Sequence, residues 1–65
     1  MDKREREQII VNAHLEKMME DMKTSEDIIF SKRFIEYYEQ KGFDVGSFKR
    51  RREYREILIS VINYN

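Results

Sequence analysis

The sequence predicts an all-α fold, a small three-helix bundle with helices near residues 4–22, 25–41 and 47–63 that dimerisation completes. Three observations lead to this prediction. Proline is absent and glycine occurs only at Gly42 and Gly46, so few residues interrupt a helix. Charged residues make up 40% of the chain, and Lys, Arg and Glu favour helix. Four Tyr, four Phe and many Ile supply enough apolar surface to argue against disorder.

The first predicted helix carries one narrow apolar seam. Its apolar residues recur at intervals of four, three and four, which places them on one side of a helix. They are Val11, Leu15, Met18 and Met22, and Met19 widens the seam. Ile9 and Ile10 lie off this seam, so they are candidates for a second contact surface.

The second predicted helix has clear start and stop signals. Thr24 and Asp27 have the spacing of a capping box in its Asp variant. Gly42 suits the left-handed position after the helix, and Phe43 would then fold back on Tyr38. One broad half of the helix is apolar, with Phe34 near its centre. This half consists of Ile28, Phe30, Phe34, Ile35, Tyr37 and Tyr38.

The third predicted helix follows a turn with two possible N-caps, Asp44 and Ser47. We expect one face of it to be buried, consisting of Tyr54, Ile57, Leu58, Val61 and Ile62. Ile59 points elsewhere, so the end of the helix is apolar nearly all round and is expected to be buried on more than one side. The β-branched residues of 57–62 also fit a strand, which could pair only with residues 9–11, and we favour helix.

Composition and motifs exclude several classes of function. The chain has no Cys and a single His, His14, so neither a thiolate nor a His-rich metal site is expected. No Ser or acid is placed to form a triad with His14, and no glycine-rich phosphate loop is present. We therefore predict no catalytic, cofactor-binding or metal-binding residues and no enzyme activity. No segment resembles a signal peptide or a membrane span, which predicts a cytoplasmic protein that does not contact a membrane.

Size favours self-association. The 65 residues can form only one domain, residues 1–65, and such a chain buries about 60% of the surface that its unfolded form exposes. Domains this small usually need a disulfide, a metal or a partner chain. Without Cys or metal ligands, a homodimer is the expected solution. The candidate self-association residues are Ile9, Ile10 and Ile59.

The charges are unevenly placed although the net charge is zero. A basic cluster near the start of the third helix consists of Lys49, Arg50, Arg51, Arg52 and Arg55. An acidic cluster around the first turn consists of Glu20, Asp21, Glu26 and Asp27, with Glu16 close by. In an up-down-up bundle we expect these clusters at opposite ends, about 25 Å apart. That separation exceeds the Debye length of about 8 Å, so we expect them to meet only in an antiparallel dimer or through an external partner.

These observations predict a small non-enzymatic regulatory or adaptor protein that acts through protein–protein contacts as a homodimer. The partner protein is not specified by the sequence. The alternative is a regulator that binds nucleic acid through the basic cluster. Zero net charge favours protein contacts over nucleic-acid binding.

Overall fold

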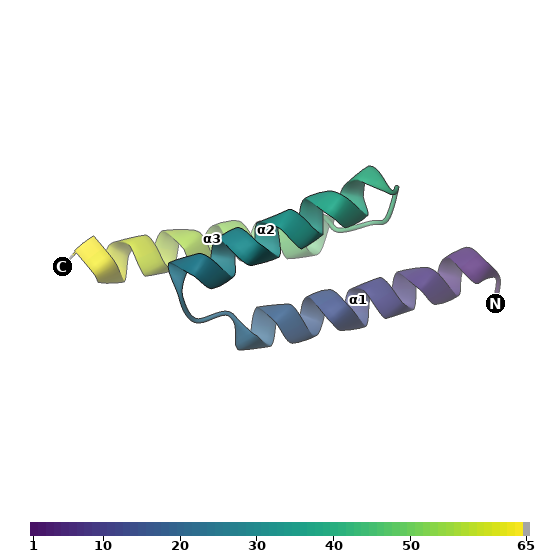
Figure 1. The fold of residues 1–65 in the computed structure, drawn as a ribbon, viewed down its shortest axis with the longest axis horizontal. Helices are drawn as coiled ribbons and strands as arrows, with labels where there is room; N and C mark the ends of the chain where they lie inside the picture. The colour runs from purple at the N-terminus through teal and green to yellow at the C-terminus, as the bar shows by residue number, and fades with distance from the viewer. Residues whose placement is uncertain (65) are drawn as a thin grey trace.

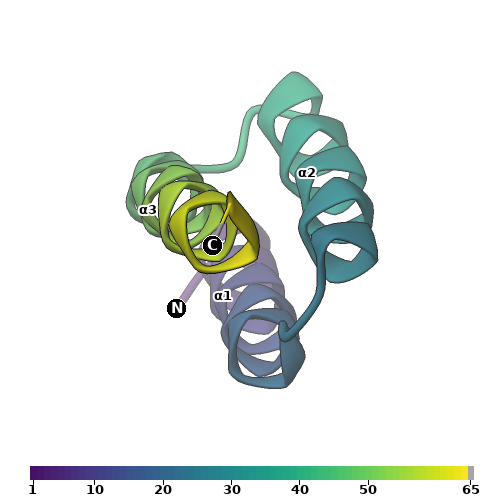
Figure 2. The same cartoon turned by 90° about the vertical axis from the view of Figure 1, so that its left-hand side faces the viewer.

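The computed structural model describes residues 1–64, which form three α-helices in an up-down-up arrangement (Figure 1). They are α1 (Lys3–Asp21), α2 (Ser25–Gln40) and α3 (Gly46–Tyr64). Seen end-on, the helices occupy the corners of a triangle (Figure 2). The described part of the chain contains no strand, so the predicted all-α three-helix fold is confirmed and residues 57–62 are helical.

The turn between α1 and α2 is held by the predicted capping box. The Thr24 hydroxyl oxygen accepts the Asp27 N–H at 3.2 Å, and the Asp27 carboxylate accepts the Thr24 N–H at 2.9 Å. The same carboxylate also accepts the Lys23 N–H at 2.8 Å. Because these backbone donors stabilise its charged form, the pKa of Asp27 lies below its ordinary value.

The end of α2 has the conformation predicted for Gly42 and Phe43. Gly42 has a φ of +87°, and its N–H donates to the carbonyl of Glu39 at 2.9 Å. The Phe43 N–H donates to the carbonyl of Tyr38 at 3.1 Å, and the two rings meet edge to face with centroids 6.0 Å apart. This is a Schellman motif with its hydrophobic contact. Arg4 of α1 covers the motif, with its guanidinium 3.9 Å from the centroid of the Phe43 ring.

The core lies between the three helices, with Leu15 and Ile35 almost fully buried at 0% and 1% exposure. The buried apolar residues are Val11, Leu15, Met19, Met22, Ile28, Ile35, Val45 and Phe48. Ser31 is also buried, and its hydroxyl donates to the carbonyl of Ile28 at 2.8 Å. Phe34, near the centre of the predicted apolar half of α2, is only partly buried and packs against the edge of the core, so it is not the most buried residue of this helix. Ile35 is the most buried apolar residue of α2.

The inner face of α3 differs from the prediction. Phe48 is buried, Ile59 packs against the core, and the side chain of Arg52, which lies between them, is only 11% exposed. The face predicted to be buried is exposed instead: Tyr54, Ile57, Leu58, Val61 and Ile62. The reason lies at the start of the helix. Because Val45 and Phe48 both enter the core, they fix the rotation of α3 about its axis. That rotation determines which residues one to three turns further along the helix face the core.

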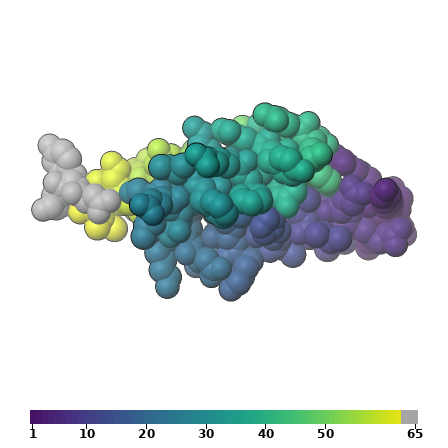
Figure 3. All heavy atoms as spheres, in the orientation of Figure 1, coloured from purple at the N-terminus to yellow at the C-terminus, as the bar shows by residue number. Residues whose placement is uncertain are grey.

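The helices are staggered rather than level. The C-terminal part of α3 extends beyond the α1–α2 turn, and the N-terminal part of α1 extends beyond the α2–α3 link (Figure 1). The molecule measures 49 × 19 × 16 Å, and the yellow part of α3 is narrower than the three-helix body in the space-filling view (Figure 3). Its radius of gyration is 13.0 Å, against about 11 Å for a compact chain of this length.

Candidate functional site: the outer face of helix α3

The stagger brings the basic cluster beside α1. Residues 41–45 run back along α1 before α3 begins, and Gln8 binds them through both backbone groups of Asp44. The Gln8 Nε2 group donates to the Asp44 carbonyl at 3.0 Å, and the Asp44 N–H donates to the Gln8 Oε1 atom at 3.0 Å. As a result α3 starts level with the middle of α1. The prediction that the two charge clusters cannot meet within one chain is therefore wrong.

Arg51 and Glu16 form the main ion pair between α1 and α3. Two parallel hydrogen bonds of 2.9 Å join the guanidinium to both carboxylate oxygens. The hydrogen bond and charge of Arg51 lower the pKa of Glu16, and those of Glu16 raise the pKa of Arg51. Glu20 adds to the attraction on Arg51. Both side chains of the pair remain about half exposed.

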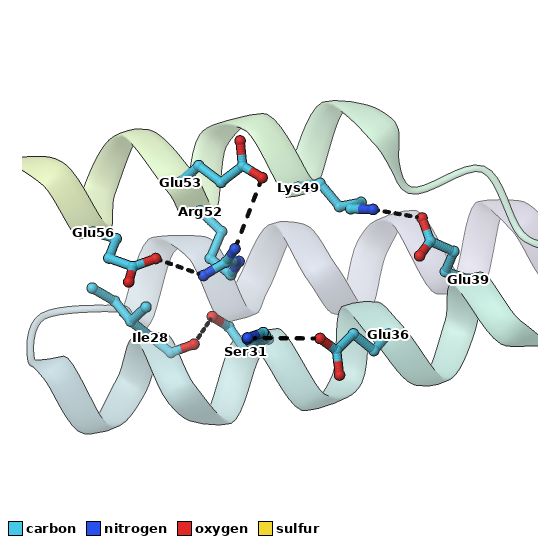
Figure 4. A network of polar contacts seen from close by, with 9 residues as sticks. Ile28, Ser31, Glu36, Glu39, Lys49, Arg52, Glu53 and Glu56 are labelled. Carbon is cyan, nitrogen blue, oxygen red and sulfur yellow. Dashed lines mark hydrogen bonds and ion pairs between the residues drawn. The ribbon is translucent and has the colours of Figure 1, made fainter.

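Two further members of the basic cluster have partners in the same chain (Figure 4). Arg52 donates to the Glu56 carboxylate at 2.9 Å and lies 4.0 Å from the carboxylate of Glu53. Lys49 donates to Glu39 of α2 at 3.0 Å. Both basic residues are therefore paired with carboxylates of the same chain.

Arg55 stabilises the end of α1. Its Nη2 group donates to the Met22 carbonyl at 2.7 Å, where α1 would otherwise leave a carbonyl without a partner. Arg50 is the exception in the basic cluster, because it has no hydrogen-bond or ion-pair partner among residues 1–64. The basic cluster thus consists of four residues with partners in the same chain and one, Arg50, that is exposed and lines the groove described below.

The acidic cluster does not form a single patch. Asp27 belongs to the capping box, Asp21 pairs with Lys17 at 3.3 Å, and Glu26 is exposed in the first turn of α2. Glu20 is the member that faces the basic cluster.

A groove lies between α1 and α3. It is open to solvent and has a volume of about 630 Å³. Its lining consists of Met19 and Glu20 of α1 and Ser47, Arg50, Arg51, Tyr54 and Arg55 of α3. Met19 and Tyr54 give it an apolar part, and the arginines give it a basic rim.

An apolar surface continues from this groove along α3. We call it the α3 apolar stripe, and it consists of Tyr54, Ile57, Leu58, Val61 and Ile62. Tyr54, Ile57 and Ile62 are 63%, 62% and 70% exposed. These residues are the face of α3 that the sequence pattern predicts to be buried, and the structure places them at the surface. The spacing of Val45, Phe48 and Ile59 was the signal that could have corrected this assignment.

The candidate self-association residues divide into two groups. Ile9 and Ile10 of α1 are exposed, as expected for residues off the apolar seam. Ile59 packs against the core, so its assignment to a free surface is wrong.

The chain matches no protein-family model, and comparisons with curated proteins and with solved structures found no match.

His14 contacts two aromatic residues of α2. Its Nδ1 atom lies 2.7 Å from the Tyr38 hydroxyl oxygen, and its ring meets Phe34 edge to face with centroids 5.1 Å apart. Within residues 1–64, no three His, Asp or Glu side chains come together in a way that could hold a metal ion.

None of the three helices, as far as residue 64, is long and apolar enough to cross a membrane.

Proposed function

We propose that this protein is a non-enzymatic regulatory or adaptor protein that acts through protein–protein contacts as a homodimer. The observation that carries the proposal is the α3 apolar stripe. Large contiguous apolar patches are rare on monomers and mark surfaces that bind another protein. The proposal therefore assigns the contact to the stripe and the adjoining groove.

The stagger of the helices supports the same proposal. Most of the stability of a protein helix comes from tertiary packing rather than from intrinsic propensity. The C-terminal part of α3 extends past the α1–α2 turn (Figure 1), and Ile57, Val61 and Ile62 of this helix are exposed. A bound protein would supply the missing packing.

The contacts of the basic cluster favour protein over nucleic acid as the partner. Binding to duplex DNA depends on several Lys and Arg side chains that are free to neutralise phosphates. Here Arg51, Arg52 and Lys49 are paired with carboxylates of the same chain. A duplex-DNA titration at two salt concentrations tests the alternative: tight binding that weakens steeply with salt would overturn the proposal.

A photoreactive amino acid placed at Ile57 tests the proposal in the native host. Lys32 on the polar side of α2 is the control position, because its side chain is similarly exposed at 57%. We expect a discrete crosslinked protein, this chain or another, at Ile57 and none at Lys32. Equal, diffuse labelling from both positions would contradict the proposal.

A further inference from the structure

We propose that two copies of this chain pair through the α3 apolar stripe, with their α3 helices antiparallel about a two-fold axis near Leu58. The inference rests on the proposed function and goes further, because it names the occupant of the stripe and its orientation. In a two-fold interface both copies use the same patch. The α3 apolar stripe of one copy would therefore pack against the stripe of the other.

The exposed area is the first argument for a second copy. The chain exposes 5106 Å² for a mass of 8.1 kDa. A compact monomer of that mass would expose about 4,500 Å², so the excess is about 600 Å². A stable interface of standard size buries about 800 Å² on each partner. Burial of an area of that size would exceed the excess surface of this chain.

Charge decides between the two orientations. In a parallel pair, Arg50 and Arg51 of the two copies would lie side by side and repel each other. In an antiparallel pair centred on Leu58, each Arg50 lies eight residues from the axis, so the two are about 24 Å apart. That distance is about three Debye lengths at physiological salt.

The apolar residues are compatible with this arrangement. Between Ile57 and Ile62 the chain carries no charged residue, so the centre of the interface would bury no charge. With the axis at Leu58, Leu58 meets its own copy, and Tyr54 meets Ile62 of the other copy. A parallel pair would instead place each residue against itself.

Single cysteines test the orientation, because the natural chain has none. We compare Tyr54→Cys alone, Ile62→Cys alone, and a mixture of the two variants under mild oxidation. Disulfides require Cα atoms about 4.4–6.8 Å apart, so only facing positions react quickly. We expect the mixed disulfide to form at least ten times faster than either self-disulfide. Faster self-disulfides than mixed disulfide would indicate a parallel pair and overturn the inference, while leaving the proposed function in place.

A charged substitution tests the surface. Ile57→Glu lies in the stripe, and Ile10→Glu on α1 is the matched control, because the two residues are 62% and 67% exposed. By sedimentation equilibrium we expect Ile57→Glu to raise the dissociation constant of the dimer at least 100-fold and Ile10→Glu to change it less than threefold. Circular dichroism should show equal helix content in both variants.

Three further results would overturn the inference, and they differ in what they mean for the proposed function. If Ile10→Glu disrupts the dimer and Ile57→Glu does not, the copies pair through α1. A homodimer that acts through protein contacts then stands, but the assignment of the contact to the α3 apolar stripe is lost. If the parent is a monomer at 100 μM but the crosslinker at Ile57 captures a different protein, the stripe binds that protein and only the homodimer is lost. A monomeric parent with no crosslinked partner would overturn both.

Discussion

Arg52 and Arg55 occupy positions on α3 that a simple amphipathic pattern gives to apolar residues. The side chain of Arg52 is only 11% exposed, and both arginines bond through their guanidinium groups to partners in the same chain. Arg52 reaches Glu56 at 2.9 Å, and Arg55 reaches the carbonyl of Met22 at 2.7 Å. Residue type alone indicated a free basic cluster, but the partners of these side chains depend on how α3 is rotated.

The pair of Arg51 and Glu16 predicts a pH-dependent effect on stability. Because the folded state lowers the pKa of Glu16, the pair stabilises the fold fully above the ordinary value of 4.5. That stabilisation is lost as the pH falls through the lowered folded value. We expect Glu16→Gln to lower the Tm relative to the parent at pH 7 and to match the parent near pH 2. Thermal unfolding followed by circular dichroism measures both.

A charge reversal provides the control for that pair. Arg51→Glu alone should lower the Tm at pH 7, and Arg51→Glu combined with Glu16→Arg should restore most of the loss, because the two groups bond directly. Restoration by Glu20→Arg instead would show that Arg51 pairs with Glu20 and not with Glu16.

Gly42 is the position where a side chain is least tolerated by the backbone. At a φ of +87°, a Cβ atom would be strained and would lie 3.0 Å from the Arg4 guanidinium. Gly42→Ala should therefore cost about 1–2 kcal/mol of unfolding free energy in a urea titration. Gly46→Ala is the matched control, because its nearest neighbour is 3.6 Å away, and it should be neutral or stabilising. Equal losses from both variants would contradict this account.

At the scale of elements, α1 and α2 could be predicted and the orientation of α3 could not. The capping box at Thr24 and the Schellman motif at Gly42 are local, so a few neighbouring residues specify them. The rotation of α3 depends instead on Val45 and Phe48 entering a core built by the other helices. Apolar residues lie on two faces of α3, and the sequence pattern predicts that the wider face is the buried one.

The inner face of α2 gives a prediction about the core. Ile35 is 1% exposed and contacts residues of the central cluster, so Ile35→Ala should cost about 2–5 kcal/mol. The same substitution at Ile29, which is exposed on the same helix, should cost less than about 0.5 kcal/mol. Chemical denaturation of both variants makes the comparison. A larger loss at Ile29 would mean that the wrong face of α2 has been placed inside.

At the scale of the whole molecule, the stagger could not be read from the sequence. It depends on the contact between Gln8 and Asp44, which are 36 residues apart. Level helices of similar length would place the two charge clusters at opposite ends, as predicted. The stagger moves α3 along α1, which brings Arg51 to Glu16 and leaves apolar residues extending at one end.

Self-association through that extended end predicts that stability depends on concentration. Partners that bind only the folded state stabilise it by mass action. We expect the Tm of the parent to rise between 2 and 200 μM, since each tenfold increase in concentration is worth about 1.4 kcal/mol per dimer. Ile57→Glu should show a constant Tm over the same range. A parent Tm independent of concentration would argue against the homodimer.

The contact of Gln8 with Asp44 also determines when one amide of the chain can exchange its hydrogen with solvent. Asp44 lies outside the helices, yet its N–H is held by a side chain from α1 rather than by its own neighbours. That amide can exchange only when the link moves away from α1, whereas helical amides can exchange when a single helix frays. The exchange rate of the Asp44 amide therefore reports the docking of the α2–α3 link on α1 independently of helix formation. Gln8→Ala should speed this exchange while amides in the middle of α2 stay protected.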